Sequence, residues 1–521
     1  MSLAEIILDD RRLQIRFTPP LLLSELLKES GVFFDMPCGG RHICKKCRIN
    51  VSGDVSPATE FELSSLSQKE VLSGVRFACA AKALGDVTLT AAHAAQNEVI
   101  LTGGTVKNVK LKPFGKKYGV AVDIGTTTVV MYLYCLKDGR AIDSASRRNP
   151  QAAFGADVIS RLDCALKGEL ESLSLSVTSC VSEMAERLCS KNDIPLSHID
   201  AAVIAGNTAM MYLFCRLNPS SVAFAPFEQD NFFGCFKKGS QLSLSFDADV
   251  YLVRSISAYI GGDITAALTA VGFHERGQGR PSLLVDIGTN GEMALASGGG
   301  LLCCSTAAGP AFEGSGIRFG MTSKDGAVSG AVFTGMSFKY EVIGGIKPVG
   351  ICGSGVLDIT AALLDAGIVD ETGKITETGH SFEENLCEHE NQDAFLLPDT
   401  DIIVTQRDIR MVQLAKSAVR AGIDTLFVEA GISAADVSKF CLAGGFGTYL
   451  NINSAVKIGM IQSELLSVAK SVGNAAGAGA AMLLLDGDLI KISEQTAKSA
   501  DTLDLTSNQT FVDGYVENMR F

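Results

Sequence analysis

The sequence predicts an α/β protein of several domains, and three observations lead to this prediction. The chain has 521 residues, which exceeds the size that one hydrophobic core usually serves. Four of its cysteines fall within the first 80 residues. An apolar strand followed by Asp-Ile-Gly-Thr occurs twice, at 123–126 and at 286–289. We therefore expect a small cysteine-bearing module followed by two related subdomains.

Composition and charge argue against several classes of function. Hydrophobic residues make up 47% of the chain and charged residues 20%, which is typical of a folded protein. A net charge of −13 disfavours binding to nucleic acid. The sequence contains no run of 18 apolar residues, and its first segment, MSLAEIILDDRR, has acids where a signal peptide carries bases. We expect a cytoplasmic protein with no nucleic-acid or membrane partner.

The N-terminal cysteines have the spacing of an iron–sulfur site. Cys38, Cys44 and Cys47 form C-x5-C-x2-C, and Cys79 follows after 31 intervening residues. Four thiolates can hold two irons and two sulfides when three come from one loop and the fourth returns from afar. Two glycines after Cys38 would let the backbone curl and direct N–H groups at the sulfurs. The pattern indicates a [2Fe–2S] cluster bound by these four cysteines.

A zinc site is the main alternative for these cysteines. Zinc ribbons usually place their ligands in two C-x2-C pairs, whereas here three cysteines stand together and one stands alone. His42 lies inside the loop but lacks the second histidine of a Rieske site. The remaining eleven cysteines are scattered and are best explained as small core residues of a chain in a reducing compartment.

The first 95 residues resemble [2Fe–2S] ferredoxins, including those with the x5 spacing, and this resemblance implies a β-grasp fold. Strand-like segments at 5–8, 13–17 and 47–51, with a short helix near 21–30, fit a small mixed sheet. Residues 96–116 carry scattered lysines and are expected to form a linker.

The repeated Asp-Ile-Gly-Thr motif predicts a nucleotide site. A buried strand that ends in Asp can hold hydrated Mg²⁺, and the following Gly opens a hairpin narrow enough for backbone N–H groups to face phosphate. Threonine hydroxyls add neutral donors. Two such hairpins facing one another across a cleft would grip the phosphates of ATP with Mg²⁺. The candidate residues are Asp123, Gly125, Thr126, Thr127, Asp286, Gly288 and Thr289.

Further glycine-rich turns fit the same scheme. Gly444 and Gly445 follow an apolar strand, where bare backbone could lie against adenine and ribose. Each such turn, taken alone, could equally be an ordinary strand end. Helical spacing over 401–427 predicts a packed helix whose basic residues, Lys416 and Arg420, are solvated, although Gln413 and Lys416 could meet nucleotide. Neither a P-loop nor a G-x-G-x-x-G fingerprint occurs.

Residues 117–521 resemble the superfamily of acetate and sugar kinases, heat-shock 70 proteins and actin. The resemblance implies duplicated ribonuclease H-like ATPase subdomains, with a first phosphate loop at 123–128, a second at 286–290 and an adenosine loop at 443–447. We expect a middle domain at 117–200 that carries the first loop, and a large ATPase domain at 201–521.

The order of these parts resembles the reductive activators of corrinoid proteins. That family implies ATP-dependent transfer of one electron from the cluster to an inactive Co(II) corrinoid protein, which restores Co(I) for methyl transfer. It also implies an upstream electron donor and a possible homodimer. A potential gap of about 100–200 mV would require roughly 2–5 kcal/mol. The segments that strengthen the resemblance are 149–151, 154–161, 258–263, 306–314 and 405–410.

Three other functions stay open at this stage. The chain could donate electrons to a different low-potential enzyme, such as a radical dehydratase. It could be a small-molecule kinase with an iron–sulfur sensor, in which case an acid or base should face the acceptor hydroxyl. Asp157 and Asp263 are possible, but each could equally serve Mg²⁺, so the sequence assigns no catalytic residue. Finally, the ATPase part could bind nucleotide without turnover, as a docking platform.

Overall fold

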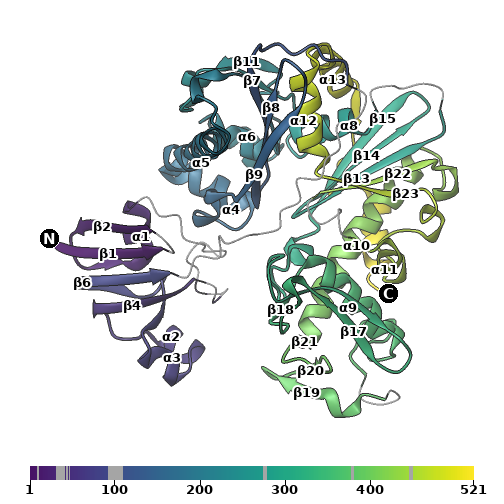
Figure 1. The fold of residues 1–521 in the computed structure, drawn as a ribbon. Coiled ribbons are helices and arrows are strands. Elements are labelled where there is room, and N and C mark those ends of the chain that lie inside the picture. The colour runs from purple at the N-terminus through teal and green to yellow at the C-terminus, as the bar shows by residue number, and fades with distance from the viewer. Residues whose placement is uncertain are drawn as a thin grey trace.

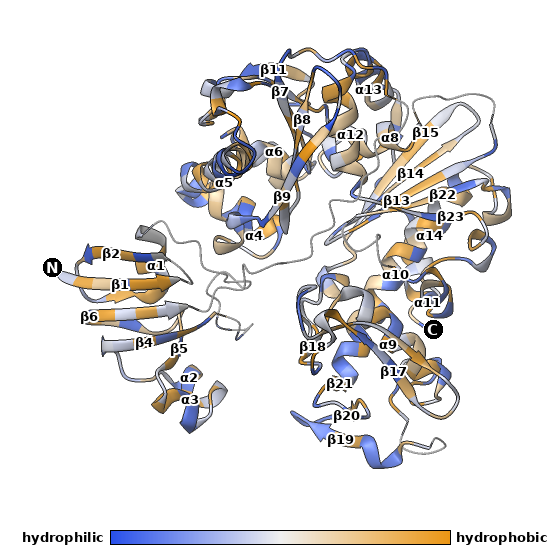
Figure 2. Cartoon of the chain, viewed as in Figure 1, coloured by the Kyte–Doolittle hydropathy of each residue, from blue (hydrophilic) through white to orange (hydrophobic). Residues whose placement is uncertain are grey.

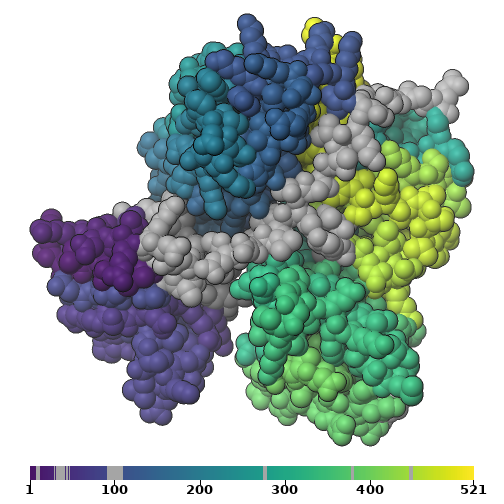
Figure 3. Space-filling view, viewed as in Figure 1, coloured from purple at the N-terminus to yellow at the C-terminus, as the bar shows by residue number. Residues whose placement is uncertain are grey.

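The computed structural model describes residues 1–8, 11–30, 42, 45, 47–91, 109–273, 279–376, 381–444 and 450–521. Three six-stranded sheets organise these residues, together with two three-stranded sheets. The N-terminal module, the middle unit and the C-terminal part form distinct lobes (Figures 1 and 3). Apolar residues concentrate in the sheets, for example along β1, β14 and β15 (Figure 2). Within the described ranges, every helix is too short or too polar to cross a bilayer.

The N-terminal module is a mixed sheet with strand order β2-β1-β6-β4-β5, and β3 pairs with β6. β1 runs parallel to β6, while the other pairs are antiparallel. Leu23, Leu26 and Leu27 of α1 are fully buried in its core, as expected for a β-grasp fold. The elements are β1 (Ser2–Leu8), β2 (Arg11–Phe17), β3 (Leu21–Leu22), α1 (Leu23–Glu29), β4 (Arg48–Val55), α2 (Glu60–Ser65), α3 (Gln68–Leu72), β5 (Val75–Phe77) and β6 (Lys82–Ala91).

The middle unit contains the second sheet, with strand order β11-β12-β10-β7-β8-β9. Its strands are β7 (Tyr118–Ile124), β8 (Thr128–Cys135), β9 (Ala141–Arg148), β10 (Ile199–Gly206), β11 (Cys235–Lys238) and β12 (Asp249–Leu252). Its helices and helical turns are η1 (Pro150–Ala153), α4 (Val158–Cys164), η2 (Ala165–Glu169), α5 (Leu170–Lys191), η3 (Leu196–His198), α6 (Thr208–Phe214), α7 (Ser220–Ala223), η4 (Gly239–Leu242) and α8 (Gly262–Ala270).

Alternation along β7 explains why this sheet is covered on both faces. Val120, Val122 and Ile124 pack in one cluster with α5 and α6, whereas Ala121 packs in another cluster with α12 (Ala475–Leu485). Because α12 comes from the C-terminal end of the chain, the two ATPase halves share an element. This helix is apolar all round, as expected for a helix that is buried on every side.

The division predicted at residue 200 is corrected by the sheet. β10 begins at Ile199 and pairs in parallel with β7, so the boundary between 200 and 201 cuts a strand in the centre of the middle unit. The last part of the predicted linker also belongs to the fold. Lys112 N–H donates to the carbonyl of Leu485, and Gly487 N–H donates to the carbonyl of Lys112. Residues 96–108 of that linker lie outside the described residues.

The third sheet repeats the arrangement of the second. Its order is β23-β22-β13-β14-β15-β24, so an antiparallel β13-β14-β15 meander is flanked by parallel β22, as β7-β8-β9 is flanked by parallel β10. This repetition confirms the predicted duplication. The strands are β13 (Ser282–Ile287), β14 (Gly291–Ser297), β15 (Gly300–Thr306), β22 (Lys439–Ala443), β23 (Ala469–Gly473) and β24 (Ala500–Thr502).

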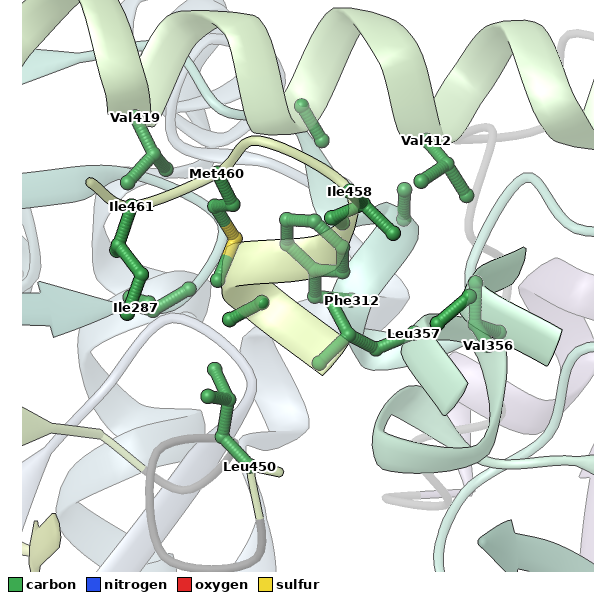
Figure 4. Close-up of a cluster of buried hydrophobic side chains, with 14 of the residues drawn as sticks. Ile287, Phe312, Val356, Leu357, Val412, Val419, Leu450, Ile458, Met460 and Ile461 are labelled. Carbon is green, nitrogen blue, oxygen red and sulfur yellow. The ribbon is translucent and has the colours of Figure 1, made fainter. Parts of the chain in front are cut away.

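Helices and two small sheets complete the C-terminal part. In Figure 4, Val412 and Val419 of α10 point toward Phe312 and Met460 in the largest core cluster. The helices are α9 (Gly353–Asp365), α10 (Gln406–Glu429), α11 (Ile452–Lys457), α13 (Asp488–Lys498) and α14 (Gln509–Glu517), with short turns η5 (Pro310–Glu313), η6 (Ile343–Gly345), η7 (Glu383–Asn385), η8 (Ala434–Asp436) and η9 (Ser463–Leu465). The small sheets comprise β16 (Ala327–Phe333), β17 (Phe338–Val342), β18 (Gly350–Ile351), β19 (Leu386–His389), β20 (Gln392–Leu396) and β21 (Ile403–Thr405).

Candidate functional site: a cleft between two hairpins and a buried cysteine pair

A cleft of about 280 Å³ lies between the two large sheets of the ATPase part. The β7–β8 hairpin lines it from one side and the β13–β14 hairpin from the other. Those predicted nucleotide residues that the structure describes all line this one cleft: Asp123, Gly125, Thr126, Thr127, Asp286, Gly288, Thr289 and Gly444. Gly445 lies outside the described residues.

Tight turns explain the glycines of this cleft. Gly125 N–H donates to the carbonyl of Thr128 at 2.9 Å, and Gly288 N–H donates to the carbonyl of Asn290 at 2.9 Å. Gly444 has φ +95, and a Cβ there would lie 2.5 Å from the carbonyl oxygen of Ile287. A side chain at 444 would therefore collide with the second hairpin, so only glycine permits this close approach.

Four acids line the cleft: Glu292 is buried, and Asp123, Asp263 and Asp286 are half-buried. Burial, followed by the charges of Asp263 and Asp286, raises the pKa of Asp123 to about 8. Burial raises the pKa of Asp286 to about 7 and that of Asp263 to about 6. The pKa of Glu292 is also raised well above its usual value, first by burial and then by Asp263 and Asp286. These carboxylates disfavour one another's ionised forms, and a cation among them would relieve the repulsion.

The positions of Asp123 and Asp286 are compatible with a hydrated ion. Among the described residues, no three His, Cys, Asp or Glu side chains are grouped closely enough to hold a metal directly. Mg²⁺ usually keeps several waters and takes one or two carboxylates together with phosphate oxygens. The placement of Asp123 and Asp286 on opposite hairpins fits that mode of binding.

Helix starts add polar groups to the cleft. Asn207 caps α6 by accepting from Ala209 N–H, and Asn474 caps α12 by accepting from Gly477 N–H. Both asparagines line the cleft, as do Gly353 and Ser354 at the start of α9. Helix N-termini carry partial positive charge, so α9 and α12 add a field that favours a phosphate chain.

Glu313 is a cleft residue that the sequence reasoning did not single out. Its carboxylate accepts from Thr127 Oγ1 at 2.5 Å and from Thr289 Oγ1 at 2.8 Å, and thus bridges the two hairpins. Glu292 was missed as well, although it lies just after the second motif. Glu313 lies within the segment 306–314, which the sequence analysis names for its family resemblance. Its position shortly after the end of a strand could have indicated a residue of the cleft.

Gln413 and Lys416 of α10 do not line the cleft. The Gln413 amide donates to the carbonyls of Thr372 and Met519, and the Lys416 ammonium donates to the carbonyl of Arg520. These two side chains hold the C-terminal segment against α10, so their interaction with nucleotide is not supported by the structure. The expectation that Lys416 is solvated is wrong, because its side chain is buried against this segment.

The cysteine site is described in part. Cys47 and Cys79 are buried, unbridged by a disulfide, and their sulfur atoms lie 3.2 Å apart. The hydrogen bond with Cys79, opposed by burial, lowers the pKa of Cys47 to about 7. Two juxtaposed buried thiols, of which Cys47 has a lowered pKa, fit a pair of ligands to a metal cluster. Cys38 and Cys44 lie outside the described residues.

A buried ion pair holds the strand that leads to Cys79. Arg76 donates to both carboxylate oxygens of Glu62, at 3.0 and 2.7 Å, and Phe77 N–H donates to the same carboxylate at 3.0 Å. Burial alone would raise the pKa of Glu62, but the bonds from Arg76, Thr59 and Phe77 leave it lowered. The pair therefore fixes β5 immediately before the cysteine.

The fold and the cleft together define a class of protein. Two ribonuclease H-like sheets with facing phosphate-type hairpins are the architecture of the acetate and sugar kinase, heat-shock 70 and actin superfamily, here joined to a ferredoxin-like module. Comparison with family models agrees: residues 118–276 match the RACo middle region, and residues 280–521 match the C-terminal domain of RACo, the ASKHA domain.

Individual relatives narrow the class. The chain is 32% identical over 444 residues to the corrinoid activation enzyme RamQ of Eubacterium limosum, covering 81% of this chain and 74% of that protein. It is 26% identical over 436 residues to the [Co(II) methylated amine-specific corrinoid protein] reductase of Methanosarcina barkeri, and the match covers 77% of this chain and 76% of that protein. The solved structure of a reductive activator for corrinoid, iron-sulfur protein matches with a TM-score of 0.71 and 27% identity. The match covers 99% of this chain and 98% of that structure.

A local match supports the N-terminal module. Over 102 residues, 20% of this chain, it is 32% identical to a component of the Na(+)-translocating NADH-quinone reductase of Chlamydia muridarum, covering 23% of that protein. The chain belongs to the family of reductive activators of corrinoid proteins, which confirms the family expected from its motifs.

Proposed function

We propose that this chain is an ATP-dependent reductive activator that passes one electron from a [2Fe–2S] cluster to the inactive Co(II) form of a corrinoid protein and so restores Co(I). The observation that carries the proposal is the joining, in one chain, of a ferredoxin-like module with a buried Cys47–Cys79 pair to a two-hairpin cleft lined by acids.

The cluster is assigned to the N-terminal cysteines. Cys38, Cys44, Cys47 and Cys79 would hold it, and the cluster when bound supplies one electron at low potential, about −400 mV for plant-type centres. The protein's own part is to fix the ligands. Glu62 and Arg76 brace β5, and Ala78 N–H donates to the carbonyl of Cys47 at 2.8 Å, so the two described ligands are held together.

The nucleotide is assigned to the cleft. Asp123 and Asp286 would hold hydrated Mg²⁺, because they end the two central strands with raised pKa values that a cation would lower. Gly125, Thr126, Thr127, Gly288 and Thr289 would face the phosphates through backbone N–H groups and hydroxyls. Gly444 and Gly445 would lie against the adenosine.

Nucleotide binding would make an unfavourable electron transfer possible. A gap of about 100–200 mV amounts to roughly 2–5 kcal/mol, which differential binding between two conformations can supply. The shared helix α12 contacts the second sheet while its cap, Asn474, lines the cleft. Nucleotide in the cleft can therefore change how the two halves are set against each other.

The partner proposed is the corrinoid protein of a methyl-transfer system. One relative acts, by its name, on the Co(II) form of a methylated amine-specific corrinoid protein, and this chain would use a substrate of the same chemical class. A separate electron donor would recharge the cluster after each transfer, and the family resemblance leaves a homodimer possible.

The decisive experiment is anaerobic reconstitution. The full chain is mixed with a cob(II)alamin-loaded corrinoid protein and a reductant, with or without Mg-ATP, and the Co(I) absorption is followed. We expect Co(I) only when both the chain and ATP are present. Equal Co(I) without ATP would contradict the ATP dependence, and no Co(I) under any condition would contradict the activity.

Two matched variants separate the two halves of this function. Cys44→Ala should abolish the visible iron–sulfur spectrum while leaving Mg-ATP affinity unchanged. Asp286→Ala should weaken Mg-ATP binding by about 10–100-fold and leave the spectrum intact. Both should prevent activation. A full [2Fe–2S] spectrum in Cys44→Ala would overturn the ligand assignment, and an unchanged affinity in Asp286→Ala would overturn the second phosphate loop.

A further inference from the structure

Glu313 connects the two halves of the cleft through a single carboxylate. One oxygen accepts from Thr127 on the β7–β8 hairpin at 2.5 Å, and the other accepts from Thr289 on the β13–β14 hairpin at 2.8 Å. The two threonines belong to the hairpins of different six-stranded sheets. Both lie in the cleft beside Glu313 itself.

These hydroxyls are the same donors that the proposed function assigns to phosphate. A threonine hydroxyl has one hydrogen to donate, so it cannot serve a carboxylate and a phosphate oxygen at once. Two anions within hydrogen-bond distance of the same donors also repel each other. A phosphate that reaches both hairpins must therefore replace the Glu313 carboxylate.

The backbone that carries Glu313 is held in place. When phosphate replaces the carboxylate, the side chain of Glu313 must therefore move rather than the backbone. Phe312, next to it, is buried in the large core cluster (Figure 4). Gly309 N–H donates to the carbonyl of Thr289 at 3.0 Å. Gly314 has φ +74, and a Cβ there would lie 2.7 Å from the carbonyl oxygen of Met321. The side chain of Glu313 is only partly buried and borders the open space of the cleft.

We infer that Glu313 is the residue by which the cleft distinguishes ATP from ADP, because its carboxylate holds the position of the terminal phosphate. The inference rests on the proposed nucleotide site. With ADP, the carboxylate keeps both threonine hydroxyls. With ATP, the terminal phosphate takes them, and the direct link between the two hairpins through Glu313 is replaced by a link through the nucleotide.

The test compares the affinities of the full chain for Mg-ATP and Mg-ADP by titration calorimetry. Glu313→Gln removes the charge and leaves an amide that can donate to phosphate. We expect it to bind Mg-ATP about tenfold more tightly than the unsubstituted chain, the size of effect that one charge-assisted hydrogen bond commonly has, with Mg-ADP affinity within about twofold. Glu384→Gln, an exposed acid far along the chain, is the matched control and should change neither affinity.

A second variant guards against an effect of misfolding. Glu313→Asp keeps the charge but shortens the side chain, so it cannot bridge both hydroxyls at these distances and should also favour ATP, by a smaller factor. An unchanged ratio of the two affinities in both variants would overturn the inference, as would slower ATP hydrolysis at an unchanged ratio, which would mark a catalytic base. If the unsubstituted chain bound neither nucleotide, the proposed function itself would fail.

Discussion

The carboxyl groups of the cleft show how single residues couple this protein to pH. Asp123, Asp263 and Asp286 have raised pKa values, of about 8, 6 and 7, because the cleft withdraws them from water, with the charges of neighbouring acids adding to the effect at Asp123 and Asp286. In the unfolded chain each would ionise near pH 4. The nucleotide-free fold therefore binds more protons than the unfolded chain between these values, and its stability falls as pH rises through them.

This imbalance gives a prediction for the protein without Mg²⁺. We expect its midpoint of thermal unfolding to decrease from pH 6 to pH 8, and we expect Asp123→Asn to flatten the decrease because it removes the group with the highest pKa. Over the same range Mg-ATP should bind more tightly, since the carboxylates must be ionised to hold the ion. Circular dichroism melts at several pH values provide the measurement. A midpoint that rises with pH would contradict the assigned pKa directions.

The buried pair of Glu62 and Arg76 gives a second prediction at the scale of residues. Glu62→Ala leaves the Arg76 guanidinium without its partner in a buried position, which typically costs about 3–5 kcal/mol. Because Arg76 directly precedes the segment with Cys79, we expect loss of the visible cluster spectrum at a lower temperature than in the unsubstituted chain. Arg12→Ala, whose pair with Glu5 is exposed, is the control and should shift the temperature little.

At the scale of elements, the contact between α8 and α12 sets the geometry of the cleft. Both helices start at the cleft, with Asp263 in the first turn of α8 and Asn474 as the cap of α12. A Cβ on Gly479 would lie 1.8 Å from the carbonyl oxygen of Ala266. The helices therefore approach each other as closely as backbones allow, and glycine is required at this point.

Gly479→Ala should push α8 and α12 apart. We expect it to destabilise the ATPase part by several kcal/mol, in the range of overpacked cores, and to weaken Mg-ATP binding because the helix starts would shift. Gly487→Ala is the matched control: its Cβ would lie 3.5 Å from the carbonyl oxygen of Lys112, an ordinary contact. Equal unfolding midpoints for the two variants would show that the helix approach is not limiting.

The elements also show which parts of the structure could be predicted from the sequence. Strands expected at 5–8 and 13–17 correspond to β1 and β2, and the helix expected over 401–427 corresponds to α10. These elements could be predicted because the periodicity of their apolar residues and the turns that bound them are visible in the local sequence. The predicted boundary at residue 200 failed because the pairing of β10 with β7 joins segments about 80 residues apart, which no local pattern encodes.

The candidate site, too, has residues that a local pattern predicts and residues that only the folded chain brings together. Asp123, Asp286 and their glycines could be recognised because the motif is local and repeated. Glu313 could not, since its importance comes from two hydroxyls on hairpins that meet only in the folded chain. The close packing of α12 on the second sheet could not be predicted either, because Ala475–Leu485 is apolar on all sides and has no polar face that would indicate its neighbour.

At the scale of the whole molecule, the chain joins a ferredoxin-like module to an ATPase part of the ASKHA type. The duplicated sheets and the relatives that share most of the chain's length make this one working unit rather than two unrelated domains. The activation assay with Cys44→Ala and Asp286→Ala examines the unit as a whole, because each variant disables one half and leaves the other available for measurement.

The attachment of Lys112 beside α12 sets a greatest possible distance between the N-terminal module and the ATPase part. Seventeen residues separate Ala91 from Val109, and a chain of that length spans at most about 60 Å whatever its conformation. A donor confined to such a radius is present at an effective concentration in the millimolar range. We therefore expect a free ferredoxin at micromolar levels to compete poorly with the attached module for a corrinoid protein that docks on the chain.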